Sequence, residues 1–204
     1  MRKKLRLGIM GGTFDPIHYG HLVTAEEALV QFNLDKVVFM PTGMPVRKTH
    51  RMVTSAEHRY LMTVIATASN PDFEVSRLEI DRPGLTYTVD SIKALRDLHG
   101  SQVELYFITG ADAVWDILTW KESASLAGAC TFIAATRPGF DLGRFAEERE
   151  RGILIETMEV PALAISSTDI RSRFSERRPV RYLLPESVAA YIEKNRLYAD
   201  GAES

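Results

Sequence analysis

The 204-residue sequence predicts an α/β fold, with a doubly wound parallel sheet followed by a small helical subdomain. Short apolar runs alternate along the chain with segments in which apolar residues recur every three or four positions, the spacing of a helix face. The first run, 5–10, passes through Gly11 and Gly12 into such a helical pattern, and a second run, 36–40, follows it. A strand–helix–strand unit implies parallel pairing with a right-handed crossover, so we expect a Rossmann-like sheet.

The helices are predicted from their apolar faces. A capping box at 54–57 begins the second helix, a helix near Ser167 precedes the last one, and Pro185 takes the first helical position of that last helix. The residues expected to face inward are, in chain order, Leu22, Ala25, Leu29 and Phe32; Leu61, Val64, Ile65 and Ala68; Val89, Ile92 and Leu95; and Val188, Tyr191 and Ile192.

Further strands are predicted at 73–80, 103–109, 129–135 and 153–160. The first and last alternate apolar with polar residues, as half-exposed strands do, whereas 103–109 is apolar enough to be central in the sheet. We expect residues 1–165 to form an α/β domain and residues 166–204 a C-terminal helical part, carrying the ISSTDIR segment, packed on it. The tail from Asp200 is polar and is expected to be disordered.

Composition limits the classes of function. With 25 Lys and Arg against 27 Asp and Glu, the net charge of -2 provides no global field for nucleic acid or an acidic membrane, so any anion site must be local. The single cysteine, Cys130, excludes an internal disulfide and is interpreted as a core residue rather than a nucleophile. The basic start lacks an apolar run long enough for a signal peptide, and no run approaches a membrane span, so we expect a cytoplasmic protein.

The segment 8–22, GIMGGTFDPIHYGHL, concentrates the chemistry. Gly11 and Gly12 lack Cβ atoms, so their backbone can take positive φ and let phosphates approach its N–H groups, and Thr13 adds a hydroxyl donor. His18 and His21 are three residues apart where a helix begins, so their rings project from one side of a turn that favours anions. Phosphate chemistry is indicated, although glycine loops follow first strands in many α/β proteins and a lone His is more often structural.

Other candidates each have an ordinary alternative. The loop 41–51 carries Arg47 and Lys48 at the carboxyl end of a strand, but it could be a solvated surface loop. The hydroxyls at 86–88 could cap a helix or hold a carboxylate, and Asp112 could bind ribose or cap a helix. Trp115 and Trp120 could be core residues, and Trp120 could instead stack on a ligand.

The segment ISSTDIR, residues 165–171, is the second concentration of polar groups. Three hydroxyls precede Arg171, so a helix starting near Ser167 would offer its N-terminus and an Arg fork to an anion. The further arginines at 173, 177, 178 and 181 are interpreted as ordinary surface.

Taken together, GGTFDPxHxGH and ISSTxIR resemble the signatures of the nucleotidylyltransferase superfamily. The segments TYTVDSI, TGADA, LTW, TRPG and LLPESVAAYIEKNRLY, in this order, extend the resemblance over nearly the whole chain, to the bacterial nicotinate-nucleotide adenylyltransferases. The resemblance implies transfer of AMP from ATP to nicotinate mononucleotide, giving deamido-NAD and pyrophosphate, with Mg2+. It implies small-molecule partners and no nucleic acid or membrane, and it leaves homo-oligomerisation open.

The resemblance also implies roles for individual residues. His18, His21, Lys48 and Arg171 would act in catalysis, Trp120 would stack on the pyridine, Thr88 would bond near its carboxylate, and Asp112 would bind ribose. No resident metal site is expected. The implied ATP-binding residues are Gly11, Gly12, Thr13, Phe14, His18, His21, Ser167, Thr168 and Arg171, and the implied pyridine-nucleotide-binding residues are Thr88, Asp112, Trp120 and Lys121.

One departure from the pattern is at residues 44–48, MPVRK, where many relatives have two prolines and a His before the Lys, which affects how this loop closes. The alternatives are an adenylyltransferase acting on nicotinamide mononucleotide or phosphopantetheine, a cytidylyltransferase, or a module that binds nucleotides without turnover. The ISSTDIR segment and the pair of Thr88 and Trp120 argue against the phosphopantetheine and cytidylyl enzymes.

Overall fold

The computed structural model describes residues 3–45, 53–111, 113–114, 126–136, 145, 152–161 and 163–199. The chain divides into two compact units. The first comprises Met1–Gly11, Thr24–Val38 and Tyr87–Ala162, and the second comprises Gly12–Val23, Phe39–Thr86 and Leu163–Ser204. The C-terminal helices therefore group with segments from the first half of the chain, and the expected boundary after residue 165 stays a prediction.

A six-stranded sheet confirms the predicted α/β class. Its order is β4 (Phe73–Val75), β2 (Lys36–Pro41), β1 (Leu5–Gly12), β6 (Val103–Gly110), β7 (Thr131–Thr136) and β8 (Leu154–Glu159). The pairs β1–β6, β6–β7 and β7–β8 are parallel. The expected central strand, β6, lies between β1 and β7.

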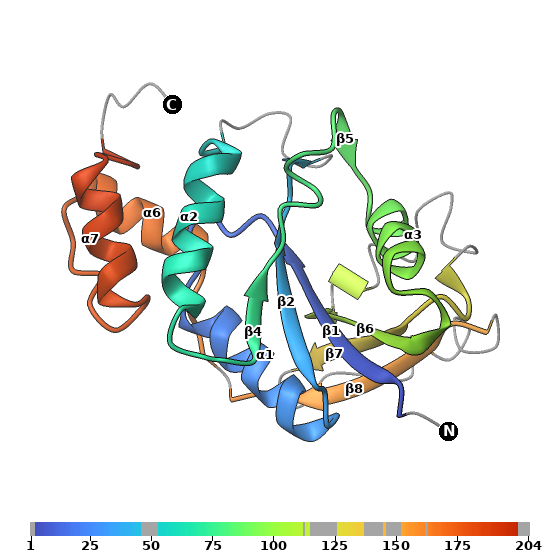
Figure 1. Ribbon diagram of the computed structural model, residues 1–204. Helices are drawn as coiled ribbons and strands as arrows, with labels where there is room; N and C mark the ends of the chain where they lie inside the picture. The colour runs from blue at the N-terminus through green and yellow to red at the C-terminus, as the bar shows by residue number, and fades with distance from the viewer. Residues whose placement is uncertain are drawn as a thin grey trace. The chain divides into compact units, whose positions relative to one another are not determined.

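The first unit has an apolar core built on β1, β6, β7 and β8, which lie side by side in Figure 1. Ile9, Ile108, Phe132 and Ile133 are fully buried in these strands. Helix α3 (Thr88–His99) buries Val89, Ile92 and Leu95, as its spacing predicts, and passes through the short η1 (Gly100–Gln102) into β6. Cys130 is buried, and burial raises the pKa of its thiol to about 12, as expected of a core residue rather than a nucleophile.

The second unit holds helices α2 (Ala56–Thr67), α6 (Ser167–Ser175) and α7 (Glu186–Lys194), with a two-stranded parallel pair of β3 (Met44–Pro45) and β5 (Leu85–Thr86). Figure 1 shows α2 beside α7. A hydrogen bond of 2.8 Å between His58 Nδ1 and the Tyr191 hydroxyl joins these two helices. Helix α1 (Tyr19–Gln31) begins in this unit and ends in the other.

The predicted inward face of α2 is wrong. Leu61, Val64 and Ala68 are exposed, and the buried residues are Arg59, Met62, Thr63, Ala66 and Thr67. The two threonines can be buried because each hydroxyl donates to a carbonyl one turn earlier, Thr63 to Arg59 O at 2.7 Å and Thr67 to Thr63 O at 2.9 Å. Apolar spacing alone therefore selected the wrong side of the helix.

Three local boundaries also differ from expectation. The cap of α2 is Ser55, which accepts from the His58 N–H, one residue later than the predicted capping box. The predicted strand 73–80 ends at Val75, because the Ser76 hydroxyl accepts from the Leu78 N–H and the Asp81 N–H donates to Arg77 O, which turns the chain. Pro185 is the N-cap of α7 rather than its first helical residue.

None of the helices in the described residues has both the length and the apolar character needed to cross a membrane.

Candidate active site

The two glycines of the first motif are strand residues. Gly11 and Gly12 end β1 without positive φ, and the positive φ expected of them occurs at Phe14, with φ 50°. A Cβ on Gly11 would lie 2.8 Å from Phe107 Cζ, and one on Gly12 would lie 2.8 Å from Phe14 Cε1. The reason for glycine at these positions is therefore the close approach of two aromatic rings, which corrects the conformational argument made from the sequence.

The two histidines stand together, as predicted. Their ring centroids are 3.8 Å apart with the planes at 25°, and the His18 N–H donates to His21 Nδ1 at 3.3 Å. The Phe14 ring meets the His21 ring edge-on at 5.1 Å. Two protonated imidazoles would repel one another at this spacing, so the stacked pair requires that at least one ring be neutral.

His18 is that neutral ring. Only 6% of the residue is exposed, and burial lowers the pKa of its imidazole to about 4. Its Nδ1 is buried, and among the described residues it has no hydrogen-bond partner. At neutral pH His18 is therefore an uncharged ring that can donate one hydrogen bond to a ligand.

Side chains from distant parts of the second unit hold the carbonyls of the loop that follows β1. Arg59 Nη1 donates to Thr13 O at 2.8 Å, Arg171 Nη1 donates to Asp15 O at 2.5 Å, and Ser167 Oγ donates to Pro16 O at 2.8 Å. These carbonyls would repel an anion if they pointed toward it. With their lone pairs engaged by donors, the loop is better suited to binding phosphate.

Arg59 is a buried side chain that the sequence analysis missed. It is 1% exposed, and besides Thr13 O it donates from Nε to Thr54 O at 2.8 Å and from Nη2 to Gly43 O at 2.9 Å. Burial lowers the pKa of its guanidinium, and the carboxylates of Asp15 and Glu79 oppose that shift. The available signal was its spacing, since Arg59 lies three and seven residues before Met62 and Ala66 on one helix face.

A second missed group is the pair of Asp15 and Tyr198. Asp15 is 1% exposed, and its carboxylate accepts a hydrogen bond of 2.8 Å from the Tyr198 hydroxyl. Burial raises the pKa of Tyr198, so the phenol stays protonated and remains a donor. No local sequence signal connects two residues at opposite ends of the chain.

Helix α6 begins at Ser167, as predicted. Its cap, Ser166, accepts from the Asp169 N–H at 3.2 Å, and Arg171 Nη2 donates to Thr168 Oγ1 at 3.0 Å. Through the contacts of Ser167 and Arg171 with Pro16 and Asp15, the structure brings the ISSTDIR segment to the loop that carries the histidines. Arg178 is exposed in its ion pair to Glu176, as expected of a surface residue, whereas Arg173 is half-buried in its ion pair to Asp169.

Of the four residues predicted to bind the pyridine nucleotide, Thr88 alone lies in the described part of the chain, so their assembly stays a prediction. Thr88 is the first residue of α3, whose N-cap, Tyr87, makes no side-chain capping bond. Lys48, Asp112, Trp120 and Lys121 lie outside the described residues, as do Arg47 and Trp115.

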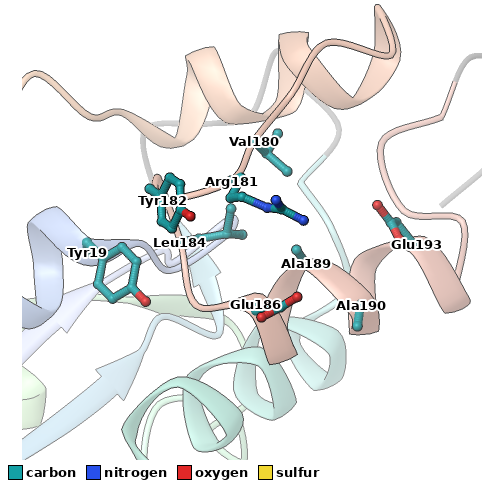
Figure 2. Close-up of a pocket in the computed structure, with 9 residues that line it drawn as sticks. All are labelled: Tyr19, Val180, Arg181, Tyr182, Leu184, Glu186, Ala189, Ala190 and Glu193. Carbon is teal, nitrogen blue, oxygen red and sulfur yellow. The ribbon is translucent and has the colours of Figure 1, made fainter.

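A cavity of about 620 Å³ also lies in the second unit (Figure 2). Figure 2 shows Arg181 directed into it, with Tyr19 and Tyr182 on one side and Glu193 on the other. Its remaining lining residues are Val180, Leu184, Glu186, Ala189 and Ala190. None of the predicted ATP-binding residues lines this cavity.

Comparison with known proteins identifies relatives over the whole chain. The family model described as cytidylyltransferase-like matches residues 9–173. A "Probable nicotinate-nucleotide adenylyltransferase" of Moorella thermoacetica is 59% identical over 95% of this chain and 91% of its own length. One with the same description from Thermoanaerobacter sp. is 56% identical over 100% of this chain and 99% of its own length.

Solved structures share the fold. The nicotinic acid mononucleotide adenylyltransferase of Plasmodium falciparum, complexed with APC, superposes with a TM-score of 0.77 at 22% identity and covers 95% of this chain and 96% of its own. Its complex with NaAD gives a TM-score of 0.75. The chain therefore belongs to the cytidylyltransferase-like family and, within it, to the nicotinate-nucleotide adenylyltransferases.

Proposed function

We propose that this chain transfers AMP from ATP to nicotinate mononucleotide, giving deamido-NAD and pyrophosphate. The observation that carries the proposal is the convergence of two stacked histidines and the first residues of α6 on one loop, in a chain 56–59% identical to relatives described as nicotinate-nucleotide adenylyltransferases. An oxygen of the acceptor's 5′-phosphate attacks the α-phosphorus of ATP in line, a P–O bond forms, and the bond to the leaving pyrophosphate breaks.

This reaction needs no nucleophile from the protein. The site must align two anions that repel one another and stabilise charge that grows on the bridging and leaving oxygens. Neutral His18 can donate one hydrogen bond without a change of protonation, and His21 stacks beside it. We assign both histidines to the triphosphate, together with Gly11 and Gly12 at the end of β1 and Thr13 and Phe14 in the loop that follows it.

Arg171 supplies the nearby fixed positive charge. Its guanidinium bonds Asp15 O and Thr168 Oγ1, which orients it at the start of α6, where free N–H groups and the helix dipole favour an anion. We assign Ser167, Thr168 and Arg171 to the ATP phosphates. Lys48 is assigned to the same phosphates from the resemblance.

The metal is proposed to be Mg2+ bound to ATP. Among the described residues, no group of three or more His, Cys, Asp or Glu side chains could hold a metal ion. The carboxylate of Asp15 is buried and bonded to Tyr198, so it fits a structural role. The metal would therefore be held by triphosphate oxygens and water, and when bound it would neutralise part of the charge on the leaving pyrophosphate.

For the acceptor, Thr88, Asp112, Trp120 and Lys121 are proposed as pyridine-nucleotide contacts, with Trp120 stacking on the ring. Trp120→Ala should then weaken nicotinate mononucleotide binding more than ATP binding, whereas equal loss for both would make Trp120 a core residue. We further propose that the enzyme works in the cytoplasm on these small molecules.

The decisive assay measures pyrophosphate release from ATP with nicotinate mononucleotide, nicotinamide mononucleotide and phosphopantetheine in turn. The proposal predicts the highest kcat/KM with nicotinate mononucleotide. Preference for another acceptor would reassign the substrate, preference for CTP over ATP would indicate a cytidylyltransferase, and binding of ATP without turnover would indicate a nucleotide-binding module.

A further inference from the structure

The side chain of Arg59 is out of reach of any substrate, yet it bonds to the loop that is proposed to bind the triphosphate. It donates to three carbonyls: Thr13 O lies in the loop that follows β1, Gly43 O lies between β2 and β3, and Thr54 O lies just before α2. One guanidinium therefore joins three segments through backbone carbonyls alone. Only an arginine offers donors in a rigid planar fork that can do this at once.

The bond to Thr13 fixes a peptide plane. In a trans peptide the C=O and the N–H of one unit point in opposite directions, so a Thr13 carbonyl held toward Arg59 directs the Phe14 N–H away from Arg59. The same argument applies to Gly43, whose carbonyl is held by Nη2 while the Met44 N–H points the other way. Phe14 also has φ 50°, a conformation that its surroundings must enforce.

The charge of Arg59 is balanced where the side chain lies. The group is 1% exposed, and the buried carboxylates of Asp15 and Glu79 stabilise its charge. Because these carboxylates offset the buried cation, Arg59 acts on the triphosphate through the geometry that it imposes on the loop rather than through a net positive field. The side chain is thus placed to set the orientation of the loop.

We propose that Arg59 is a positioning residue for ATP, which orients the Thr13–Phe14 peptide so that its N–H faces the triphosphate. The inference rests on the proposed adenylyl transfer. Arg59 touches no reacting atom and acts through the backbone of the loop. Its removal should therefore weaken the binding of ATP rather than the binding of the acceptor.

The test compares Arg59→Met and Arg59→Lys with the wild type in steady-state pyrophosphate release. Arg59→Met should raise the KM for ATP about tenfold or more, with the KM for nicotinate mononucleotide changed less than about threefold. Arg59→Lys keeps the charge but not the fork and should recover part of the loss. The matched control is Arg77→Met, which removes an exposed arginine that pairs with Glu57 of α2 and should change neither KM.

Equal rises in both KM values, or none, would overturn the proposal. If the wild type itself shows no turnover with nicotinate mononucleotide, the proposed function fails instead, and the two failures are thereby distinguished.

A second measurement needs no variant and so does not depend on whether Arg59→Met folds. In an amide ¹H–¹⁵N spectrum of the wild type, a non-hydrolysable ATP analogue should shift the Phe14 amide proton strongly downfield, because a phosphate oxygen accepts from it. An unmoved Phe14 amide at saturating analogue would overturn the assignment. Calorimetry on the same sample verifies that the analogue has bound.

Discussion

The sheet of the first unit and the loop 13–18 of the second are held in place by different interactions. Strands β1, β6, β7 and β8 are fixed by parallel pairing and buried apolar side chains such as Ile108 and Phe132. The loop is fixed by buried polar side chains, with Arg59, Arg171, Ser167 and Tyr198 bonded to it. The scaffold therefore depends on burial, whereas the site depends on a few directed hydrogen bonds.

The largest expected effect is at the reacting end of the loop. His18→Ala should lower kcat by about 10²–10³, since one hydrogen-bond donor to a developing negative charge typically contributes this much. His58→Ala, which removes a histidine bonded to Tyr191 instead, is the control and should keep kcat within about twofold. A normal kcat with a raised KM alone would mean that His18 binds the ground state and the transition state equally.

Burial of His18 also makes folding sensitive to acid. Its pKa is about 4 in the folded protein against 6.5 for an unperturbed imidazole, so the unfolded chain takes up the proton first as the pH falls. The stability from a neutral His18 is complete above about pH 6.5 and is lost toward pH 4, at most roughly 3 kcal/mol. Urea unfolding at several pH values should show a shallower acid loss in His18→Asn than in the wild type. If the free energy of unfolding fell equally steeply with acid in both proteins, His18 would have an unperturbed pKa.

Tyr198→Phe tests the polar region by removal of a single hydroxyl. The buried Asp15 carboxylate loses a donor, so thermal unfolding should show a loss of about 1.5–3 kcal/mol, the range for hydrogen bonds to charged groups. Tyr182→Phe is the matched control, because Tyr182 is 82% exposed. An equal melting temperature for the two variants would contradict the structural role of the Tyr198 hydroxyl.

The apolar region is tested by Gly8→Ala. The new Cβ would lie 2.8 Å from Leu34 Cδ1 and 3.0 Å from Ile108 Cδ1, both in the first unit. We expect about 1–2 kcal/mol of destabilisation, at the low end for overpacking because side-chain ends can shift. The kcat/KM of the folded variant should stay within about twofold of the wild type, and a loss beyond that would show that the two regions are not separable.

The smallest effect concerns Cys130. With its thiol buried and its pKa raised to about 12, the native protein should not react with a thiol reagent at pH 8. With a reagent that releases a chromophore when it reacts with a thiol, the absorbance should rise only after addition of denaturant. Reaction of the native protein within minutes would place Cys130 at the surface.

The sequence predicts the apolar sheet region better than the polar contacts of the loop. Apolar spacing located the strands and the inward face of α3, and the motif residues located the start of α6. Apolar spacing selected the wrong face of α2. The buried threonines and Arg59 satisfy their polar groups within the fold, but their residue types are hydrophilic in sequence.

The polar contacts of the loop could not be predicted, because they join residues far apart in the chain. Arg59 lies 46 residues from Thr13, and Tyr198 lies 183 residues from Asp15. Periodicity carries no information about such pairs. The roles of Lys48, Asp112, Trp120 and Lys121 stay predictions, since these residues lie outside the described part of the chain.

The stacked imidazoles of His18 and His21 are proposed to bind the triphosphate, and ¹⁵N spectra of the histidine rings during titration with a non-hydrolysable ATP analogue test this most directly. The ring nitrogens of both residues should shift with the same affinity that calorimetry measures, and His18 should stay neutral at pH 7. Saturation by the analogue with both rings unperturbed would contradict it.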